Sequence, residues 1–297
     1  KSSKKTRLHV LDIGCGRGGD ILKMYHARVG YYVGIDPDYE TIFSATNGAV
    51  NRYNNFKSKF PDFSKMTFIN ADGGALLNET DQEKAIPKLS TENKNLIKEI
   101  FTKKNQFDVI NFSFTIHYLF GTKLAVNNLI QKIKNNLKIG GLIIIELFDA
   151  EKVVNLLGDK NSYTSYYTDE EGKKLKFFEI IKKFKGDLIN VPGLAIDVHM
   201  SWISDEGNYH EEYLVPKKLL IETMKKADCM LVDTYSFSSL YEINRPYFAD
   251  VIQYEENQKN KKFYQDAAKF YEDLKGVDKE SKTYSSLSRY YIFKKIE

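Results

Sequence analysis

The stretch LDIGCGRGGD at residues 11–20 decides the fold of this chain. Its glycines at positions 14, 16 and 19 fit the spacing GxGxxG, in which a strand turns sharply into a helix and a ligand approaches the backbone closely. Asp36 ends the next predicted strand, where a carboxylate accepts hydrogen bonds from both hydroxyls of a ribose. The stretch therefore predicts a nucleoside-binding α/β domain, and by itself it fits a nicotinamide dinucleotide equally well.

Strand and helix signals alternate on both sides of this turn. Short apolar runs that end at glycine or aspartate predict buried parallel strands. These strands are expected at residues 8–13, 31–35, 66–71, 107–112, 141–148, 230–235 and 290–296. Helical spacing predicts one helix at about 19–27 and another from Val126 to the glycine pair at 140–141. The alternation predicts a Rossmann-like α/β fold, a mostly parallel seven-stranded sheet with helices on both faces.

Three segments interrupt the alternation. Residues 74–105 are polar and lysine-rich and predict a partly helical insertion, and residues 151–213 predict a second insertion, β-rich from 161 and with a turn at 205–208, which we expect to cover a substrate. Residues 246–274 predict a long charged amphipathic helix region. We expect one domain over 1–297, excised from a longer polypeptide because the chain opens on Lys1 and reaches a strand within eight residues.

Composition restricts the class of protein. The 297 residues carry 44 basic and 40 acidic side chains, and the net charge of +4 permits a nucleic-acid partner without requiring one. Cys15 and Cys229 are the only cysteines, so neither a disulfide framework nor a zinc site with paired cysteines is expected, and we expect no metal and a cytoplasmic location. The longest apolar run, residues 142–145, is far short of the roughly 20 residues that span a bilayer, so no membrane contact is expected.

Carboxylates accompany three of the predicted strand ends. Asp12 precedes the glycine turn, Asp36 ends the second strand and Asp72 follows the third. Carboxylates at these positions suit a ligand with a sulfonium, an ammonium and an adenine amine, whereas a pyrophosphate would be repelled. The pattern favours S-adenosylmethionine. The alternative interpretation, ordinary helix caps and turn formers, is the one we prefer for Asp20 and Asp38.

Four motifs in order resemble those of the mRNA cap guanine-N7 methyltransferases, especially the domain carried by multifunctional capping enzymes of large cytoplasmic DNA viruses of the poxvirus and asfarvirus kind. GCGRGGD at residues 14–20 is similar to that family's GCGKGGD turn, and SFTIHY at 113–118 to its QFxxHY segment. NRYN at 51–54 resembles its arginine-bearing helix, and EEYLVP at 211–216 its EYxVP segment. The resemblance implies a class I methyltransferase fold that moves a methyl group from S-adenosylmethionine to N7 of the guanine cap, GpppN, of mRNA, leaving S-adenosylhomocysteine.

The resemblance also implies roles for individual residues. Together with the glycine and strand-end pattern, it gives as expected donor-binding residues Asp12, Gly14, Gly16, Asp36, Pro37, Asp72, Gly73, Ser113 and Tyr118. The cap-binding residues it implies are Arg17, Arg52, Phe114, His117, Tyr118 and Glu212. The two arginines would meet the cap phosphates, the aromatic residues and His117 would line the guanine pocket, and Glu212 would accept the base N1 and N2 protons. Taken singly, the aromatic residues and His117 fit a protein core, and Glu212 fits a solvated surface.

The chain departs from the family pattern at two positions. The family places a donor-binding lysine upstream of the first strand, for which Lys1, Lys4 and Lys5 are the candidates here. It also brings a tyrosine from its last strand to the base, five residues before a phenylalanine, and counting back from Phe293 reaches Ser288. Tyr284 and Tyr290 are the alternatives. No acid or base catalyst is expected, because guanine N7 keeps its lone pair at neutral pH and catalysis is then positioning.

Three other functions stay open at this point. The glycine turn also suits an NAD-dependent oxidoreductase, and a cap 2′-O-methyltransferase with a lysine-centred tetrad shares the fold. A catalytically silent methyltransferase-like module that binds RNA or regulates a partner is the third. As partners the resemblance implies the capped RNA 5′ end and covalently linked triphosphatase and guanylyltransferase domains upstream. Whether an activating subunit is needed stays open.

Overall fold

The computed structural model describes residues 7–60, 62–104, 106–269, 272 and 274–297. The chain divides into two compact units. The first consists of Lys1–Leu147, Lys218–Asp233 and Tyr291–Glu297, and the second of Phe148–Lys217 and Thr234–Tyr290. Among the described residues no helix is both long and apolar enough to cross a membrane.

A seven-stranded sheet forms the centre of the first unit, and three of its strands continue into the second. Its order is β10-β11-β5-β4-β1-β2-β3. The bounds are β1 His9–Ile13, β2 Tyr31–Asp36, β3 Lys65–Asn70, β4 Phe107–Ser113, β5 Leu137–Phe148, β10 Cys229–Ser236 and β11 Ser288–Lys295. Strands β1 to β5 pair in parallel. The mostly parallel seven-stranded sheet predicted from the sequence is confirmed.

Strand β11 is antiparallel to its neighbour β10. At one end of the pair the Ile296 N–H donates to the Asp228 carbonyl, and at the other the Thr234 hydroxyl donates to the Tyr290 carbonyl. The order of the strands reverses at β1, because β2 and β3 lie on one side of it and β4 and β5 on the other. In open α/β sheets ligands bind outside the carboxyl ends of the strands at such a point. The turn at residues 14–20 follows β1 directly and therefore stands at this position.

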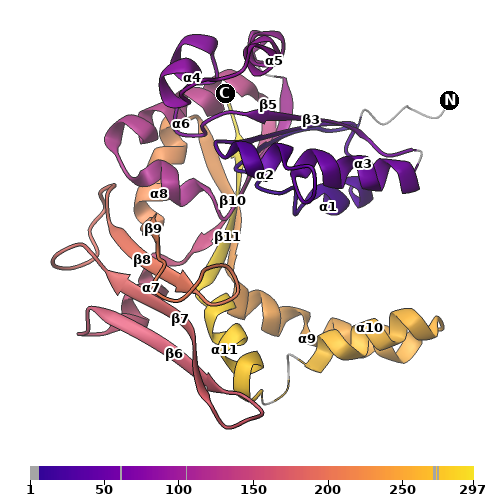
Figure 1. The fold of residues 1–297 in the computed structure, drawn as a ribbon, viewed down its shortest axis with the longest axis vertical. Coiled ribbons are helices and arrows are strands. Elements are labelled where there is room, and N and C mark those ends of the chain that lie inside the picture. The colour runs from indigo at the N-terminus through magenta and orange to yellow at the C-terminus, as the bar shows by residue number, and fades with distance from the viewer. Residues whose placement is uncertain (1–6, 61, 105, 270–271, 273) are drawn as a thin grey trace. The chain divides into compact units, whose positions relative to one another are not determined.

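Helices cover both faces of this sheet. Figure 1 shows α1 (Ile21–His26), α2 (Tyr39–Phe43) and α3 (Ala49–Lys59) on one side of β3 and α4 (Glu79–Ala85) and α5 (Thr91–Phe101) on the other. The last two are the helical content predicted for residues 74–105. Three further helices precede or follow strands of this sheet along the chain. They are the short 3₁₀ helix η1 (Ile116–Phe120), α6 (Lys123–Asn136) and α8 (Lys217–Lys226).

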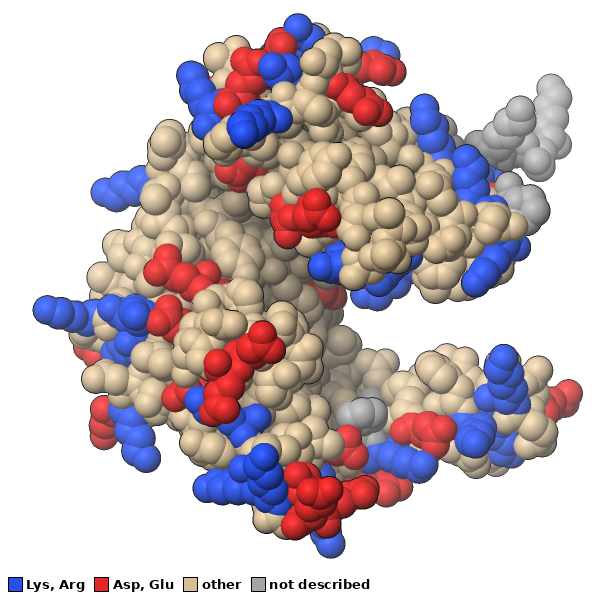
Figure 2. All heavy atoms as spheres, viewed as in Figure 1, with Lys and Arg blue, Asp and Glu red and all other residues tan. Residues whose placement is uncertain are grey.

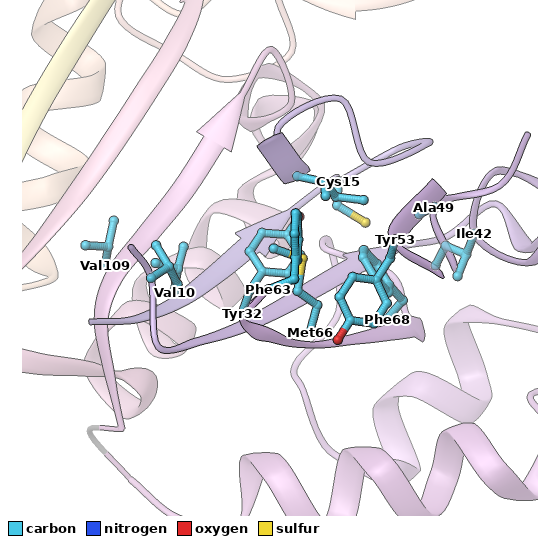
Figure 3. Close-up of a cluster of buried hydrophobic side chains, with 12 residues drawn as sticks. Val10, Cys15, Tyr32, Ile42, Ala49, Tyr53, Phe63, Met66, Phe68 and Val109 are labelled. Atoms are coloured by element: carbon cyan, nitrogen blue, oxygen red, sulfur yellow. The ribbon is translucent and has the colours of Figure 1, made fainter. Parts of the chain in front are cut away.

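An aromatic core lies between the sheet and α1, α2 and α3. Tyr32 on β2 and Phe68 on β3 are fully or almost fully buried, with ring centroids 5.7 Å apart, and Tyr53 of α3 packs against Phe68 (Figure 3). Burying one such side chain stabilises the fold by about 1.5–3 kcal/mol. Cys15 points into the same cluster, and burial raises the pKa of its thiol well above the usual value. The cysteine inside the glycine turn is therefore a packing group.

The second unit contains the predicted β-rich segment. Its four-stranded antiparallel sheet has the order β6-β7-β8-β9. The bounds are β6 Ser162–Thr168, β7 Lys174–Lys182, β8 Ala195–Met200 and β9 His210–Tyr213. The turn predicted at 205–208 is confirmed, because the Asn208 N–H donates to the Asp205 carbonyl at 3.1 Å. The other elements of this unit are α7 (Ala150–Leu157), α9 (Phe237–Tyr254), α10 (Gln258–Ala268) and α11 (Gly276–Ser285).

One predicted helix boundary is wrong. The helix that contains Val126 ends at Asn136 and not at the glycine pair 140–141, because β5 already begins at Leu137. Gly140, with a φ of +79°, lies inside β5, next to the point where its register against β4 shifts. A positive-φ glycine also forms strand bulges, so the pair does not identify a helix end.

The helix region predicted at 246–274 contains two helices among its described residues. The first, α9, begins well before Pro246, after the cap residue Ser236, and ends at Tyr254. Asn257 then caps α10, since its side-chain oxygen accepts the N–H groups of Lys259 and Asn260. The break follows from this local cap, which satisfies the first free N–H groups of a new helix.

Candidate functional site

The glycine turn is fixed between the end of β2 and the loop that follows β4. The Gly14 and Cys15 N–H groups donate to the Ile35 carbonyl at 2.8 and 3.0 Å. The Thr115 hydroxyl donates to the Ile13 carbonyl at 2.6 Å, and a Cβ on Gly14 would lie 2.2 Å from the Thr115 methyl group. The φ of Gly14 is +81°. Only glycine fits at this position, both for conformation and for space.

Gly18 is a second constrained glycine of the turn, although it is not one of the three glycines of the GxGxxG pattern. Gly18 has a φ of +73°, and its Cβ would lie 2.4 Å from Ile21 Cδ1 and 3.4 Å from the Cβ of Ala49 at the start of α3. A Cβ on Gly19 would face open space. The pattern therefore identified the right turn, but in this chain Gly18, and not Gly19, allows the close packing of helix and turn.

Asp36 connects the end of β2 to the turn. One carboxylate oxygen accepts the Gly16 N–H at 2.9 Å, and the other accepts the Asp38 N–H at 3.0 Å and the Thr41 hydroxyl at 3.2 Å. The side chain is half-buried. Asp38 itself caps α2 by accepting the Glu40 N–H, so its interpretation as a cap is confirmed. These bonds hold the Asp36 carboxylate in one orientation beside the turn.

Asp12 lies beneath the turn and not at its surface. It is 2% exposed, and its carboxylate accepts the Tyr32 hydroxyl at 2.6 Å and the Asn111 side-chain amide at 2.9 Å. Burial raises the pKa of Asp12 to about 6. Because the carboxylate is almost completely buried, it offers little open surface to a ligand, and its contact with a donor stays a prediction. Its bonds join β1 to β2 and β4 under the turn.

Asp72 and Gly73 form the loop at the end of β3. The Asp72 N–H donates to the side-chain oxygen of Gln82, which is fully buried, and the Gln82 amide donates back to the Asp72 carbonyl. A Cβ on Gly73 would lie 2.8 Å from Ile13 at the start of the turn. The exposed Pro37 joins this region through its carbonyl, which accepts the Asn70 side-chain amide at 2.8 Å. The loop after β3 therefore contacts the turn after β1.

The loop after β4 carries two exposed aromatic side chains. Phe114 is 46% exposed and has a φ of +53°, and Tyr118 is 47% exposed. These values show that neither is a core residue. His117 is buried, with its ring centroid 4.1 Å from that of Tyr118, and burial lowers the pKa of His117 to about 3. The imidazole is therefore neutral at any working pH.

The arginines of the turn and of α3 lie in segments that touch. Arg17 is exposed and precedes Gly18, where an added Cβ would lie 3.4 Å from the Cβ of Ala49. Arg52 is on the first turn of the helix that Ala49 begins. Among the residues that the structure describes, no carboxylate pairs with either guanidinium. Figure 2 shows Lys and Arg interspersed with Asp and Glu over the visible face. The two guanidiniums are free to bind an anionic group.

Glu212 belongs to the second unit, whereas the other predicted site residues belong to the first. It lies on β9 opposite Ile196 of β8 and is buried. Burial raises the pKa of Glu212 to about 7. The side chain is therefore not the solvated surface glutamate of the alternative interpretation.

The two departures from the family pattern have different outcomes. Lys1, Lys4 and Lys5 lie outside the described residues. Ser288 is buried in β11, and the Tyr284 hydroxyl donates to the Met200 sulfur at 2.9 Å within the hydrophobic core of the second unit. Tyr290 lies 6.2 Å from Tyr235, measured between ring centroids. The contacts of Tyr284 are those of a packing residue.

Two site residues were not recognised from the sequence. Glu146 of β5 accepts the Ser113 hydroxyl at 2.6 Å, and its carbonyl accepts the Phe114 N–H at 2.9 Å. The signal was present, since Glu146 interrupts the apolar run of a buried strand. Gln82, which fixes the loop at Asp72, lies in a polar helix and left no such signal. Within the described part of the chain no group of His, Cys, Asp and Glu has the arrangement of a metal site.

The chain is similar to known RNA-capping proteins along most of its length. The "Probable mRNA-capping enzyme" of Acanthamoeba polyphaga mimivirus is 37% identical over 96% of this chain and 25% of the relative. The "mRNA-capping enzyme" of African swine fever virus is 25% identical over 77% of this chain and 24% of the relative. The "mRNA cap guanine-N(7) methyltransferase" of Lodderomyces elongisporus is 26% identical over 83% and 40%. The chain thus spans about a quarter of the length of the two viral relatives.

A family profile matches nearly the whole chain. A solved S-adenosylmethionine-dependent methyltransferase from Clostridium acetobutylicum aligns with 96% of this chain and 83% of its own, at 14% identity and a TM-score of 0.47. The profile of the mRNA (guanine-N(7))-methyltransferase domain matches residues 1–296. A match over nearly every residue shows that the chain belongs to the mRNA (guanine-N(7))-methyltransferase domain family.

Proposed function

We propose that this chain transfers a methyl group from S-adenosylmethionine to N7 of the guanine in the GpppN cap of mRNA. Its membership of the guanine-N7 methyltransferase domain family over residues 1–296 carries the proposal. The convergence of the turn at Gly14 with Asp36 and the loop at Asp72, all at the carboxyl ends of adjacent strands, supports it.

In this proposal the donor binds over the glycine turn. Gly14 and Gly16 let the backbone approach the ligand, and the free lone pairs of the Asp36 carboxylate accept the ribose hydroxyls. Asp72 faces the adenine amine, with Pro37 and Gly73 forming the walls beside it. Ser113 and Tyr118 border the amino-acid end of the donor. Asp12 also acts indirectly, because its bonds to Tyr32 and Asn111 hold the strand that precedes the turn.

Six residues are assigned to the cap. Arg17 and Arg52 bind its phosphates, and bidentate guanidinium geometry suits that role. Phe114 and Tyr118 offer exposed rings to the base, and the neutral imidazole of His117 adds no positive charge near a guanine that becomes cationic on methylation. Glu212 accepts the N1 and N2 protons. A carboxylate at that position selects guanine, because adenine carries no proton at N1.

The chemistry needs no general base. The N7 lone pair forms the new N–C bond as the C–S bond breaks, the sulfonium supplies the methyl group and a neutral thioether leaves, so no proton is transferred. What the protein residues contribute is alignment of the base with the methyl carbon in a site that excludes water. Ideal alignment of this kind lowers a barrier by about 7–11 kcal/mol. We therefore assign no residue as an acid or base catalyst.

A methyl-transfer assay with matched RNAs tests the proposal. Labelled S-adenosylmethionine is mixed with the protein and RNA that ends in GpppN, or with the same RNA already methylated at N7. We expect label on the first RNA and none on the second. Equal labelling of both would contradict N7 as the acceptor and would favour a 2′-hydroxyl. Stabilisation of the protein by NAD, with none by S-adenosylmethionine, would support an oxidoreductase instead, and donor and cap binding without transfer would support a silent module.

The wider setting of the domain is also a proposal. The two viral relatives are capping enzymes about three to four times as long as this chain, judged by the aligned lengths and the share of each relative that they cover. We infer that the domain works joined to triphosphatase and guanylyltransferase domains, which would make the GpppN end, and that it does so in the cytoplasm. Purification of the native polypeptide with all three activities in one chain would support this arrangement.

A further inference from the structure

Lys132 of α6 is buried without a hydrogen-bond partner. Its side chain is 1% exposed, and among the described residues no group accepts a hydrogen bond from its Nζ atom. An unpaired ammonium that is removed from water is strongly destabilising, so buried lysines are nearly always paired. A position of this kind therefore calls for a physical reason.

Another buried lysine of the first unit shows how this fold satisfies such a group. Lys295 of β11 is buried too, but its ammonium donates to the carbonyls of Lys134 and Leu137, both at 2.9 Å. These bonds join the end of α6 to the beginning of β5 and give Lys295 a structural role. Lys132 makes no comparable bond, so a purely structural role does not account for it.

The face of α6 that carries Lys132 contacts the loop at the end of β3. Asn128, four residues earlier and hence on the same helix face, donates from its side-chain amide to the Gly74 carbonyl at 3.0 Å. Asp72 belongs to this loop and is the charged group whose field acts on the Lys132 ammonium. The unpaired cation thus lies beside the loop that we assign to the adenine end of the donor site.

We propose that Lys132 is a positioning residue that sets the charge at the adenine end of the donor site through Asp72, and that binding of S-adenosylmethionine releases its proton. The inference rests on the proposed function, which gives Asp72 its ligand. S-adenosylmethionine carries a net positive charge near neutral pH, so its arrival disfavours a second cation next to the same carboxylate. A neutral amine at Lys132 leaves Asp72 as the stronger acceptor for the adenine amine.

The pKa of Lys132 lies near neutral pH, so the binding of a charged donor can change the protonation state of this residue there. Burial lowers the pKa of Lys132 to about 7, and the negative charge of Asp72 opposes that shift. The other buried groups near the turn, Asp12 and His117, have pKa values of about 6 and 3 and change charge at lower pH. If the bound donor lowers the Lys132 pKa by a further unit, donor affinity rises about tenfold as pH increases through this range, and then levels off.

Calorimetric titration of the protein with S-adenosylmethionine and S-adenosylhomocysteine between pH 6 and 8.5 tests the proposal. For the wild type we expect affinity for S-adenosylmethionine to rise about fivefold over this interval, which is most of the tenfold total. The change should be smaller for S-adenosylhomocysteine, which lacks the sulfonium charge. Repeating the titrations in two buffers of different ionisation enthalpy measures the proton released. Lys132→Met should bind at every pH as tightly as the wild type does at high pH, because methionine cannot be charged.

Lys134→Met is the matched control, since Lys134 lies on the same helix but is partly exposed and pairs with Asp228. We expect it to keep the wild-type pH profile. A Lys132→Met variant with the wild-type pH profile and only an offset in affinity would overturn the proposal and leave a structural role. If that variant does not fold, absence of proton release by the wild type near pH 7 overturns it equally. Failure of the wild type to bind S-adenosylmethionine at all would instead contradict the proposed function.

Discussion

Gly14 and Gly19 belong to one turn but carry different constraints. Gly14 has a φ of +81° and no room for a Cβ, whereas a Cβ on Gly19 meets nothing within 4 Å. We expect Gly14→Ala to lower the free energy of unfolding by about 2–4 kcal/mol, since a side chain with positive φ costs about 1–2 kcal/mol and Thr115 must also move. Gly19→Ala should change it by less than about 0.5 kcal/mol. Urea denaturation of the two variants checks this, and equal losses would contradict the geometry of the turn.

Glu212 gives a prediction about pH. Its pKa is raised to about 7 by burial, from 4.5 in an unfolded chain. Between these values the folded state holds a proton that the unfolded state has lost, so this residue makes stability fall as pH rises from 4.5 to 7 and stay low above 7. Glu212→Gln cannot ionise and should gain up to about 3 kcal/mol over the wild type at pH 8, with little difference at pH 4.5.

The same variant separates stability from function. Because the proposal needs an ionised Glu212 to accept two base protons, cap affinity of the wild type should rise with pH through about 7, and Glu212→Gln should bind the cap weakly at every pH. Urea denaturation and cap titration at pH 5 and 8 measure both properties. Glu211→Gln, at the exposed neighbouring position, is the control. A stability difference that does not vary with pH would contradict the burial of the Glu212 charge.

Single residues also show what sequence alone could and could not provide. The turn, Asp36 and Asp72 could be selected as candidates because strand ends and glycine spacing are local signals. The role of Gly18 depends on Ala49, and that of Asp12 on Tyr32 and Asn111, and these partners are distant in sequence. The sequence alone therefore did not reveal either set of contacts.

At the scale of elements, one buried ion pair connects α7 to β11. Asp149 caps α7 by accepting the Lys152 N–H, and its other oxygen accepts Arg289 Nε at 2.7 Å. The Asp149 side chain is 5% exposed. Arg289→Ala leaves this carboxylate buried and unpaired, so we expect a loss of about 3–5 kcal/mol in unfolding free energy.

An exposed pair provides the comparison for Arg289. Lys269 and Asp266 are 2.7 Å apart, with side chains 65% and 52% exposed. Exposed pairs are worth about 0–1 kcal/mol, so Lys269→Ala should be nearly neutral. Urea denaturation in low and high salt measures both variants. A loss for Arg289→Ala as small as that for Lys269→Ala would show that the pair does not hold the two elements together.

Elements differ in how well their limits could be predicted. Buried strands were recognised because short continuous apolar runs bounded by turn residues are typical of strands covered on both faces. Helix ends were less certain, since the glycine pair at 140–141 fits a helix cap and a strand bulge alike. The break before α10 depends on the cap at Asn257, which looks like any polar residue in a charged segment. The sheet could thus be predicted from hydrophobicity, whereas these limits depend on local hydrogen bonds.

At the scale of the whole molecule, two substrates must be bound by distinguishable groups. The proposal assigns Arg17 to the cap and Asp36 to the donor, although Arg17 lies in the glycine turn and Asp36 contacts the same turn. Arg17→Ala should weaken cap binding about 10- to 100-fold, the worth of a charged hydrogen bond, and leave donor affinity nearly unchanged. Asp36→Ala should have the reverse effect. Separate titrations with a cap analogue and with S-adenosylhomocysteine measure this, and equal losses of both ligands in either variant would contradict the division.

The net charge of the whole chain determines how its RNA binding should depend on salt. With only +4 overall, and with both signs interspersed on the face in Figure 2, no broad cationic surface is expected to dominate the binding of RNA. If Arg17 and Arg52 supply two phosphate contacts, the logarithm of capped-RNA affinity should fall with the logarithm of salt concentration with a slope of about −1.4, since each contact to single-stranded RNA contributes about −0.7. Donor affinity should hardly change over the same range.

Removing one guanidinium should remove one contact. Arg17→Ala and Arg52→Ala should each reduce the slope to about −0.7, and the double variant should nearly abolish it. Lys57→Ala, on the same helix as Arg52 but at an exposed position near its end, should keep the wild-type slope. Fluorescence titrations of capped RNA at several salt concentrations supply these slopes. A wild-type slope several times steeper, insensitive to both arginines, would mean that RNA is held mainly by other cations, and that the two guanidiniums beside the turn do not position the cap.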